Sequence, residues 1–335
     1  MPAQMTKRER VEAAIAGQPV DRTPISFWGH DYKREWSAET HAQQTLEFVI
    51  EHDLDYVKIN PRFSYLMEAF GGVFAPSGND VDGPVPVVIP VREPEDLDKI
   101  QAAPTWHPSL VEQLTATRMI VQGLHGDRIA VQTLFSPLGV LGNLATGDRR
   151  TDTSILSGWF HEHPAALHHA LAEITETIIA FGLEVLNTGV DGIFYAPLGW
   201  AAKDNATEAQ YREFGRPYDL RILHAFGGAG VKFLHVCRTN NMLASMLDYP
   251  VDVFHWDTHG EGNLSLKDAR TRTTVALAGG VSNATLLTGD AAWLHDEVVE
   301  AQGDTGPGLL LAGSCSISPQ TSAAAIRATL AAVRG

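Results

Sequence analysis

The only two cysteines of the chain lie in two distant segments, and one of them is close to a histidine. The stretch FLHVCRTNN at 233–241 places His235 and Cys237 two residues apart, and Cys315 ends the apolar run GLLLAGSC. One imidazole and two thiolates form a ligand set that zinc prefers, with a fourth position left for water or substrate. Two plainer interpretations stay open, because a buried cysteine often packs as a small apolar residue and two cysteines can form a disulfide.

The elements that must position these residues alternate along the chain. Short apolar runs alternate with helical segments, which favours a parallel sheet with crossover helices. We expect strands at 23–28, 54–60, 128–135, 190–196, 231–237, 251–257, 274–281 and 308–315. We expect helices at 40–52, 164–188, 207–227, 240–247, 264–270 and 318–334, and a looser excursion at 61–127.

Eight strands with helices between them predict an α/β fold, a single (β/α)8 TIM barrel over residues 1–335 with an extended excursion after strand 2. A doubly wound open sheet is less favoured, since no G-x-G-x-x-G follows the first expected strand. Barrel enzymes carry their working residues at the carboxyl ends of the strands, and residues two apart on a strand share a face. His235, Cys237 and Cys315 are therefore expected to meet at the barrel mouth.

Composition excludes several classes of partner. The chain has 25 Lys+Arg against 40 Asp+Glu, a net charge of −15, which argues against binding to nucleic acid or to an anionic membrane. No stretch approaches the roughly 20 apolar residues of a membrane span. The start, MPAQMTKRERVEAAIAG, is typical of a charged amphipathic helix rather than a signal peptide. Two cysteines in so long a chain do not form a disulfide framework, so we expect a cytoplasmic protein with reduced thiols.

Several of these stretches resemble one known family. FLHVCRTNN, DVFHWD, VALAGGVS and LLLAGSCSISPQTSAAAIRA, with the N-terminal TKRERVEAAIAGQPVDRTPI, resemble the uroporphyrinogen decarboxylase superfamily. The resemblance is to its zinc-dependent, methylcobalamin:coenzyme M methyltransferase-like branch, and it thins between about 60 and 125. It implies a (β/α)8 barrel and a zinc motif of His-x-Cys with a distant Cys. That motif maps onto His235, Cys237 and Cys315.

The resemblance also implies an activity, methyl transfer between a corrinoid and a small thiol whose sulfur zinc activates. The stretch SFWGHDYKREW at 26–36 stands where decarboxylases carry an Arg-Gln-Ala-Gly-Arg motif for the tetrapyrrole carboxylates, which disfavours decarboxylation. DTHGEG at 257–262 fits the short D-x-H-x-x-G cobalamin pattern but follows an expected barrel strand. We therefore expect the corrinoid to arrive as free cobalamin or on a separate protein.

Further residues at strand ends are candidates for contacts with substrate or cofactor. His30 follows the first expected strand, Asn60 ends the second, Tyr195 lies near the end of the fourth and Asp257 ends the sixth. Asp257 could accept a hydrogen bond from a histidine ligand of the metal. The histidine-rich run HEHPAALHH at 161–169 is instead interpreted as a helix start at Pro164.

Two other functions stay open at this point. One is a demethylase that moves a methyl group from a small methylated compound to a corrinoid. The other is a barrel related to uroporphyrinogen decarboxylase that binds a tetrapyrrole without zinc. The sequence also leaves open the direction of transfer, the methyl donor and acceptor, and whether the chain is a monomer or a homodimer.

Overall fold

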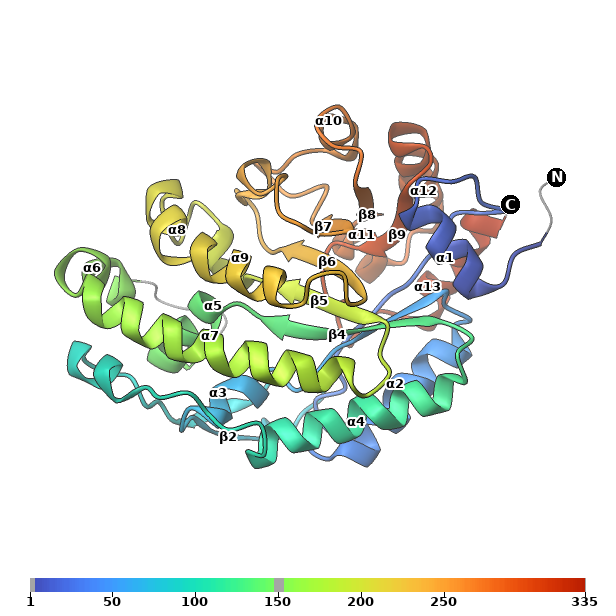
Figure 1. Ribbon diagram of the computed structural model, residues 1–335. Helices are drawn as coiled ribbons and strands as arrows, with labels where there is room; N and C mark the ends of the chain where they lie inside the picture. Colours follow the sequence, from blue (N-terminus) through green and yellow to red (C-terminus); the bar gives the residue numbers. More distant parts are fainter. Residues whose placement is uncertain (1–3, 148–153, 335) are drawn as a thin grey trace.

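The computed structural model describes residues 4–147 and 154–334, and these residues form a curled parallel sheet surrounded by helices (Figure 1). Within this part of the chain the main sheet has seven strands, in the order β1-β4-β5-β6-β7-β8-β9. Their bounds are β1 Tyr56–Ile59, β4 Ile129–Phe135, β5 Gly192–Ala196, β6 Val231–Val236, β7 Val253–Trp256, β8 Ala276–Val281 and β9 Leu309–Gly313. Each lies inside an expected strand, so the predicted barrel-like α/β fold is confirmed.

The eighth position of the barrel is filled by an extended segment rather than a regular strand. The backbone of Ser26 donates to Leu311 O at 3.0 Å, and Leu311 N donates to Pro24 O at 2.8 Å. On the other side, Asp55 N donates to Ile25 O at 2.9 Å. The segment expected to be a strand at 23–28 thus bridges β9 and β1 without a continuous ladder, in part because Pro24 has no N–H to donate.

The expected excursion after β1 contains regular elements of its own. It holds α3 Tyr65–Ala69, the antiparallel pair β2 Val73–Ala75 and β3 Val85–Val88, the short 3-10 helix η1 Pro94–Lys99 and the long helix α4 Pro108–Leu124. The sequence analysis did not anticipate α4, although it begins with Pro108 in its first turn, a common helix start.

The remaining helices surround the sheet, most of them on its outer face, while α1 (Lys7–Ile15) packs Val11 and Ala14 against the cluster inside the barrel (Figure 1). They are α1 Lys7–Ile15, α2 Ala38–Glu51, α5 Pro137–Thr146, α6 Ser154–Glu162, α7 Pro164–Leu186, α8 Glu208–Phe214, α9 Arg216–Ala225, α10 Leu266–Arg270, α11 Asn283–Thr288, α12 Ala291–Thr305 and α13 Ala323–Arg334. The helix expected at 207–227 is two helices that meet at Gly215, where Pro217 follows and lacks the N–H of a continuous helix. Only a 3-10 turn, η3 Leu243–Ser245, forms where a helix was expected at 240–247.

Strand side chains alternate between two separate cores. One layer packs between the sheet and the helices, and a second, smaller cluster fills the barrel interior with residues such as Tyr56, Val131 and Phe194. Because residues two apart share a face, this inner column continues toward the carboxyl ends of β1, β6 and β7 as Lys58, His235 and His255. These three polar side chains therefore lie next to the apolar cluster inside the barrel, at the carboxyl ends of the strands, where catalytic residues of such barrels usually lie. Within the described residues no helix is both long and apolar enough to cross a membrane.

Candidate metal centre

The structure brings together the three residues that the sequence singles out as metal ligands. His235 Nε2 lies 3.0 Å from Cys237 Sγ and 3.4 Å from Cys315 Sγ, and the two sulfurs are 3.8 Å apart. His235 is buried, while both cysteines are partly exposed and unbridged. Three soft donor atoms within 4.8 Å of one another, open on one side, could hold a metal ion.

The two cysteine turns are held by asparagine side chains that the sequence analysis did not single out. Asn283, at the start of α11, accepts from Ser314 N at 3.1 Å through Oδ1 and donates to Ser316 O at 2.9 Å through Nδ2. These bonds clamp both neighbours of Cys315. Asn241 similarly donates to Val236 O, just before Cys237. Asn283 lies two residues after the end of β8 and Asn241 five residues after the end of β6, so an asparagine in the loop after a barrel strand is the sequence signal of this role.

His255 fixes the orientation and tautomer of His235. Its Nε2 donates to Gly313 O at 2.9 Å, because a carbonyl can only accept, and its Nδ1 lies 2.7 Å from His235 Nδ1. Burial, with the neighbouring His235, lowers the pKa of His255 to about 3, so the ring is neutral and its Nδ1 must accept. His235 therefore donates through Nδ1 and presents the lone pair of Nε2 to the sulfurs.

The two thiols perturb each other's ionisation. Hydrogen bonding with Cys237 lowers the pKa of Cys315 well below its usual value, and the positive charge of Lys58 acts in the same direction. The same hydrogen bond, together with burial, raises the pKa of Cys237. The pair thus releases one proton readily and holds the second, as expected for two thiols in contact. A cation between the sulfurs would remove the repulsion that opposes the second ionisation.

Aromatic rings form the floor of the site. Phe194 lies 5.5 Å from the His235 ring and 5.6 Å from the His255 ring, and Trp28 lies 5.0 Å from His255, between ring centroids. Phe194 and Trp28 are almost fully buried. They close the base of the site to water, which strengthens electrostatic interactions there.

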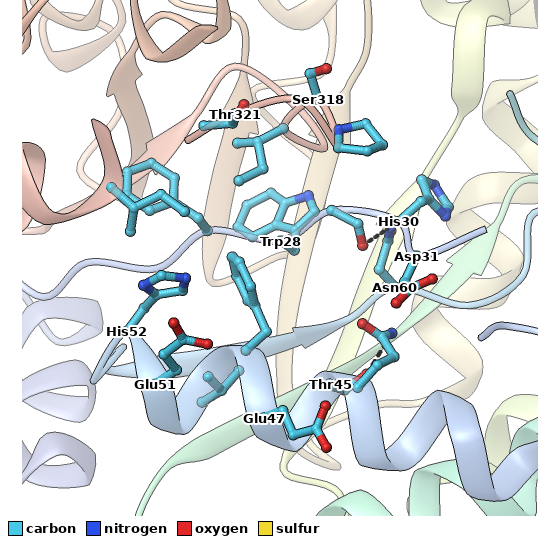
Figure 2. Close-up of a pocket in the computed structure, with 18 of the residues that line it drawn as sticks. Trp28, His30, Asp31, Thr45, Glu47, Glu51, His52, Asn60, Ser318 and Thr321 are labelled. Carbon is cyan, nitrogen blue, oxygen red and sulfur yellow. Dashed lines mark hydrogen bonds between the residues drawn. The ribbon is translucent and has the colours of Figure 1, made fainter. Parts of the chain in front are cut away.

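Asn60 and His30 line a pocket of about 460 Å³ (Figure 2). Asn60 Nδ2 donates to Gly29 O at 2.9 Å, and its Oδ1 accepts from Lys58 and from Ser316. His30 Nδ1 lies 2.8 Å from a carboxylate oxygen of Glu35, and its ring stacks on Tyr32. Both side chains line this pocket, and their contact with substrate or cofactor stays a prediction.

Tyr195 does not reach the metal centre. Its hydroxyl donates to Asp219 on α9 at 2.6 Å, on the helix side of β5, and the residue is fully buried. Tyr211 and Tyr249 donate to the same carboxylate. Because side chains alternate along a strand, Phe194 faces the barrel interior and Tyr195 faces away. The expected contact between Tyr195 and substrate is therefore not supported by its position.

Asp257 does not serve as the acceptor for the histidine ligand. It follows the end of β7, and its Oδ1 accepts from the backbone of His259 at 3.1 Å within the next turn. His255, two residues earlier, occupies the position next to His235 that was considered for Asp257. The turn DTHGEG continues from a barrel strand, and HEHPAALHH begins α7 at Pro164, as expected.

Comparison with known proteins places the chain in a family. The family model described as uroporphyrinogen decarboxylase (URO-D) matches residues 6–335. The chain belongs to the uroporphyrinogen decarboxylase family. This membership confirms the resemblance seen in the sequence and makes the chain a member of a family of enzymes.

Curated relatives of this family member are distant. The uroporphyrinogen decarboxylase of Mycobacterium ulcerans is 26% identical over 237 residues, which cover 67% of this chain and 65% of that enzyme, slightly under two thirds of its length. The enzyme of the same name from Mycobacterium tuberculosis strain H37Rv is 25% identical over 316 residues, or 90% of this chain and 82% of that enzyme.

Solved structures show the same fold. A methyltransferase from Methanosarcina mazei superposes with a TM-score of 0.85 at 22% identity, covering 99% of both chains. A B12-independent methionine synthase from Shewanella sp. W3-18-1 superposes with a TM-score of 0.58 at 13% identity, covering 94% of both chains. At these identities the likeness is one of fold.

Proposed function

We propose that this protein is a zinc-dependent methyltransferase that moves a methyl group between a corrinoid, methylcobalamin, and a small thiol. The observation that carries the proposal is the convergence of His235, Cys237 and Cys315 at the open end of the barrel. One imidazole and two thiols suit zinc better than magnesium or calcium, which prefer oxygen ligands. Zinc held there would lower the pKa of a substrate thiol and supply it as a thiolate.

The residues around the ligands prepare the site for this chemistry. His255 keeps the ligand nitrogen of His235 unprotonated, and Asn283 fixes the turn that carries Cys315. Phe194 lies against His235 and excludes water from below. Zinc, two cysteine thiolates and a neutral imidazole would together have no net charge. A substrate sulfur bound to such a neutral centre would stay nucleophilic. The corrinoid would approach from the open side, as free cobalamin or on a separate protein.

The loop after the first barrel segment weighs against a tetrapyrrole with many carboxylates as the substrate. Lys33 pairs with Asp80 at 2.7 Å, and Arg34 pairs with Glu47 at 2.7 Å. These two cations of the loop are already engaged with carboxylates. The names of the similar proteins point both ways: the Methanosarcina mazei neighbour, at 22% identity, is named a methyltransferase, and the curated relatives, at 25–26% identity, are named uroporphyrinogen decarboxylases. The proposal therefore rests on the set of metal-ligating side chains.

The proposal is tested by incubating the zinc-loaded protein with methylcobalamin and a small thiol. Loss of methyl-Co(III) absorbance, with the S-methyl product identified by mass spectrometry, is expected for the wild type and not for Cys315→Ala. In the opposite direction, formation of methyl-Co(III) from Co(I) corrinoid and a methylated compound would show a demethylase. Release of CO2 from uroporphyrinogen by the metal-free protein, with no methyl transfer in either direction, would contradict the proposal.

A further inference from the structure

Two polar side chains at one end of the pocket make no hydrogen bond within the part of the chain that the structure describes. His52 directly follows α2 and is only 7% exposed, and its ring packs against Phe48 with 4.8 Å between centroids. Thr321, in the loop between β9 and α13, has a buried hydroxyl oxygen without a partner. Both side chains line the pocket. Figure 2 shows His52 at one end of the pocket, His30 at the other end and Trp28 between them.

The buried part of the pocket wall is otherwise apolar. Phe27, Val49 and Ile326 line the pocket, and each is at most 3% exposed. A buried hydroxyl or imidazole without a hydrogen-bond partner costs free energy, because it has lost its bonds to water. Most such groups in folded proteins are therefore satisfied. His52 and Thr321 indicate that a ligand group completes their hydrogen bonding at this end of the pocket.

The charges around His52 favour an uncharged ligand group. Burial lowers the pKa of His52, so its ring is neutral at neutral pH and offers one donor and one acceptor. The negative charge of Glu51 and the positive charge of Arg327 act on this ring in opposite directions. A carboxylate can only accept and an ammonium can only donate. A primary carboxamide does both, so it can satisfy the imidazole and the Thr321 hydroxyl together.

The pocket also reaches the loop that carries a metal ligand. Ile317 and Ser318, two and three residues after Cys315, line its wall, as does Asn60. Asn60 Oδ1 accepts from the hydroxyl of Ser316 at 3.5 Å. A cofactor over the metal centre could therefore place one of its side chains into this pocket.

We infer that His52 and Thr321 bind a carboxamide side chain of the corrinoid and so orient its ring over the barrel mouth. This inference rests on the proposed function, which brings a corrinoid to the metal centre. Cobalamin carries primary carboxamides at the ends of short methylene chains around its corrin ring. The methylene chain packs along Phe27, Val49 and Ile326, and the carboxamide forms hydrogen bonds with His52 and Thr321.

The test is the binding of cyanocobalamin to the zinc-loaded full-length protein, measured by equilibrium dialysis and cobalamin absorbance without any turnover. His52→Phe and Thr321→Val keep the approximate size of each side chain and remove its hydrogen bonding. Each variant is expected to bind about 2- to 10-fold more weakly, as for the loss of one hydrogen bond. Dicyanocobinamide, which lacks the nucleotide but keeps side-chain carboxamides, is expected to show the same losses. A loss with cyanocobalamin alone would assign the contact to the nucleotide and refute the inference.

The matched control is Thr305→Val. The Thr305 hydroxyl is also buried and without a partner in the described chain, but this residue ends α12 and lies outside the pocket wall. The control is expected to bind cyanocobalamin as the wild type does. Urea unfolding separates binding from folding: His52→Phe and Thr321→Val should unfold at the same urea concentration as the wild type or a higher one, because each removes an unpartnered polar group. A lower midpoint in both variants would indicate a structural role and count against the inference.

The remaining outcomes separate the inference from the proposed function. Unchanged cyanocobalamin affinity in both variants would mean that only water binds these two groups, and would overturn the inference while the methyltransferase proposal stands. Pantetheine, an amide-bearing thiol, is titrated into the Co(II)-substituted protein, whose visible spectrum changes on thiolate coordination. A loss for pantetheine but not for cyanocobalamin would place the amide on the thiol substrate and contradict the corrinoid contact. A wild type that binds neither corrinoid nor thiol would contradict the proposed function itself. If one variant does not fold, the other decides the question.

Discussion

The most informative perturbation of the metal centre leaves all three ligands in place and removes the hydrogen-bond partner of His235, which is His255. In His255→Phe a planar ring of similar size keeps the packing against Trp28 and Phe194, at 5.0 and 5.6 Å, but both hydrogen bonds of His255 are lost. His235 then has no acceptor for Nδ1–H and is free to adopt the tautomer that protonates its ligand nitrogen. Loss of such a supporting partner typically weakens metal binding about 10- to 100-fold, or about 1.4–2.7 kcal/mol.

The zinc dissociation constant is measured by competition with a chromophoric chelator at neutral pH. The matched control is His259→Phe, since His259 also lies near a backbone oxygen, Gly280 O at 3.1 Å, but belongs to the turn after β7. Urea unfolding of each metal-free variant separates a folding defect from a binding defect. An unchanged zinc affinity in His255→Phe, with the protein folded, would refute the role assigned to His255.

Three further outcomes follow from the structure. Burial raises the pKa of Asp219 to about 6 from 3.8, so its contribution to folding is present below pH 4 and is lost as the pH rises through 6. The free energy of unfolding of the wild type, measured against Asp219→Asn, should therefore fall by about 2 kcal/mol between pH 4 and 7, and a difference that does not change with pH would contradict this. Tyr195→Phe should lower the free energy of unfolding by about 1–3 kcal/mol, because the hydrogen bond to Asp219 is lost. The kinetics of thiol methylation should not change. A raised KM for the thiol would show that Tyr195 does contact the substrate. In Gly192→Ala the new Cβ would lie 1.9 Å from Val231 O, so unfolding in urea should show a loss of at least about 1–3 kcal/mol, and wild-type stability would argue against this strand contact.

The ligand set could be predicted from the sequence because each step depends on local geometry. Alternation along a strand puts His235 and Cys237 on one face, and barrel closure brings Cys315, in the turn after β9, to the same end. The same alternation is ambiguous where a strand is apolar on both faces. In β5 every residue is buried, so the sequence does not reveal that Phe194 faces inward and Tyr195 outward.

Supporting contacts are harder to predict, because they depend on side-chain directions across different strands. His255 and Asp257 share a sequence spacing with His235 and Cys237, but Asp257 Oδ1 accepts from the backbone of His259 within the following turn, a contact that the spacing does not reveal. The clamp by Asn283 requires the relative position of α11 and the turn after β9. By contrast, α4 was within reach of prediction, since Pro108 and the spacing of its buried residues mark a helix.

The central claim is that His235, Cys237 and Cys315 hold one zinc ion at the barrel mouth. Elemental analysis of the purified full-length protein, beside Cys315→Ala and the control His259→Phe, tests it most directly. About one zinc per chain is expected in the wild type and the control, with most of it lost from Cys315→Ala. Full zinc content in folded Cys315→Ala, or a wild-type protein that takes up no zinc when the metal is supplied, would contradict the account.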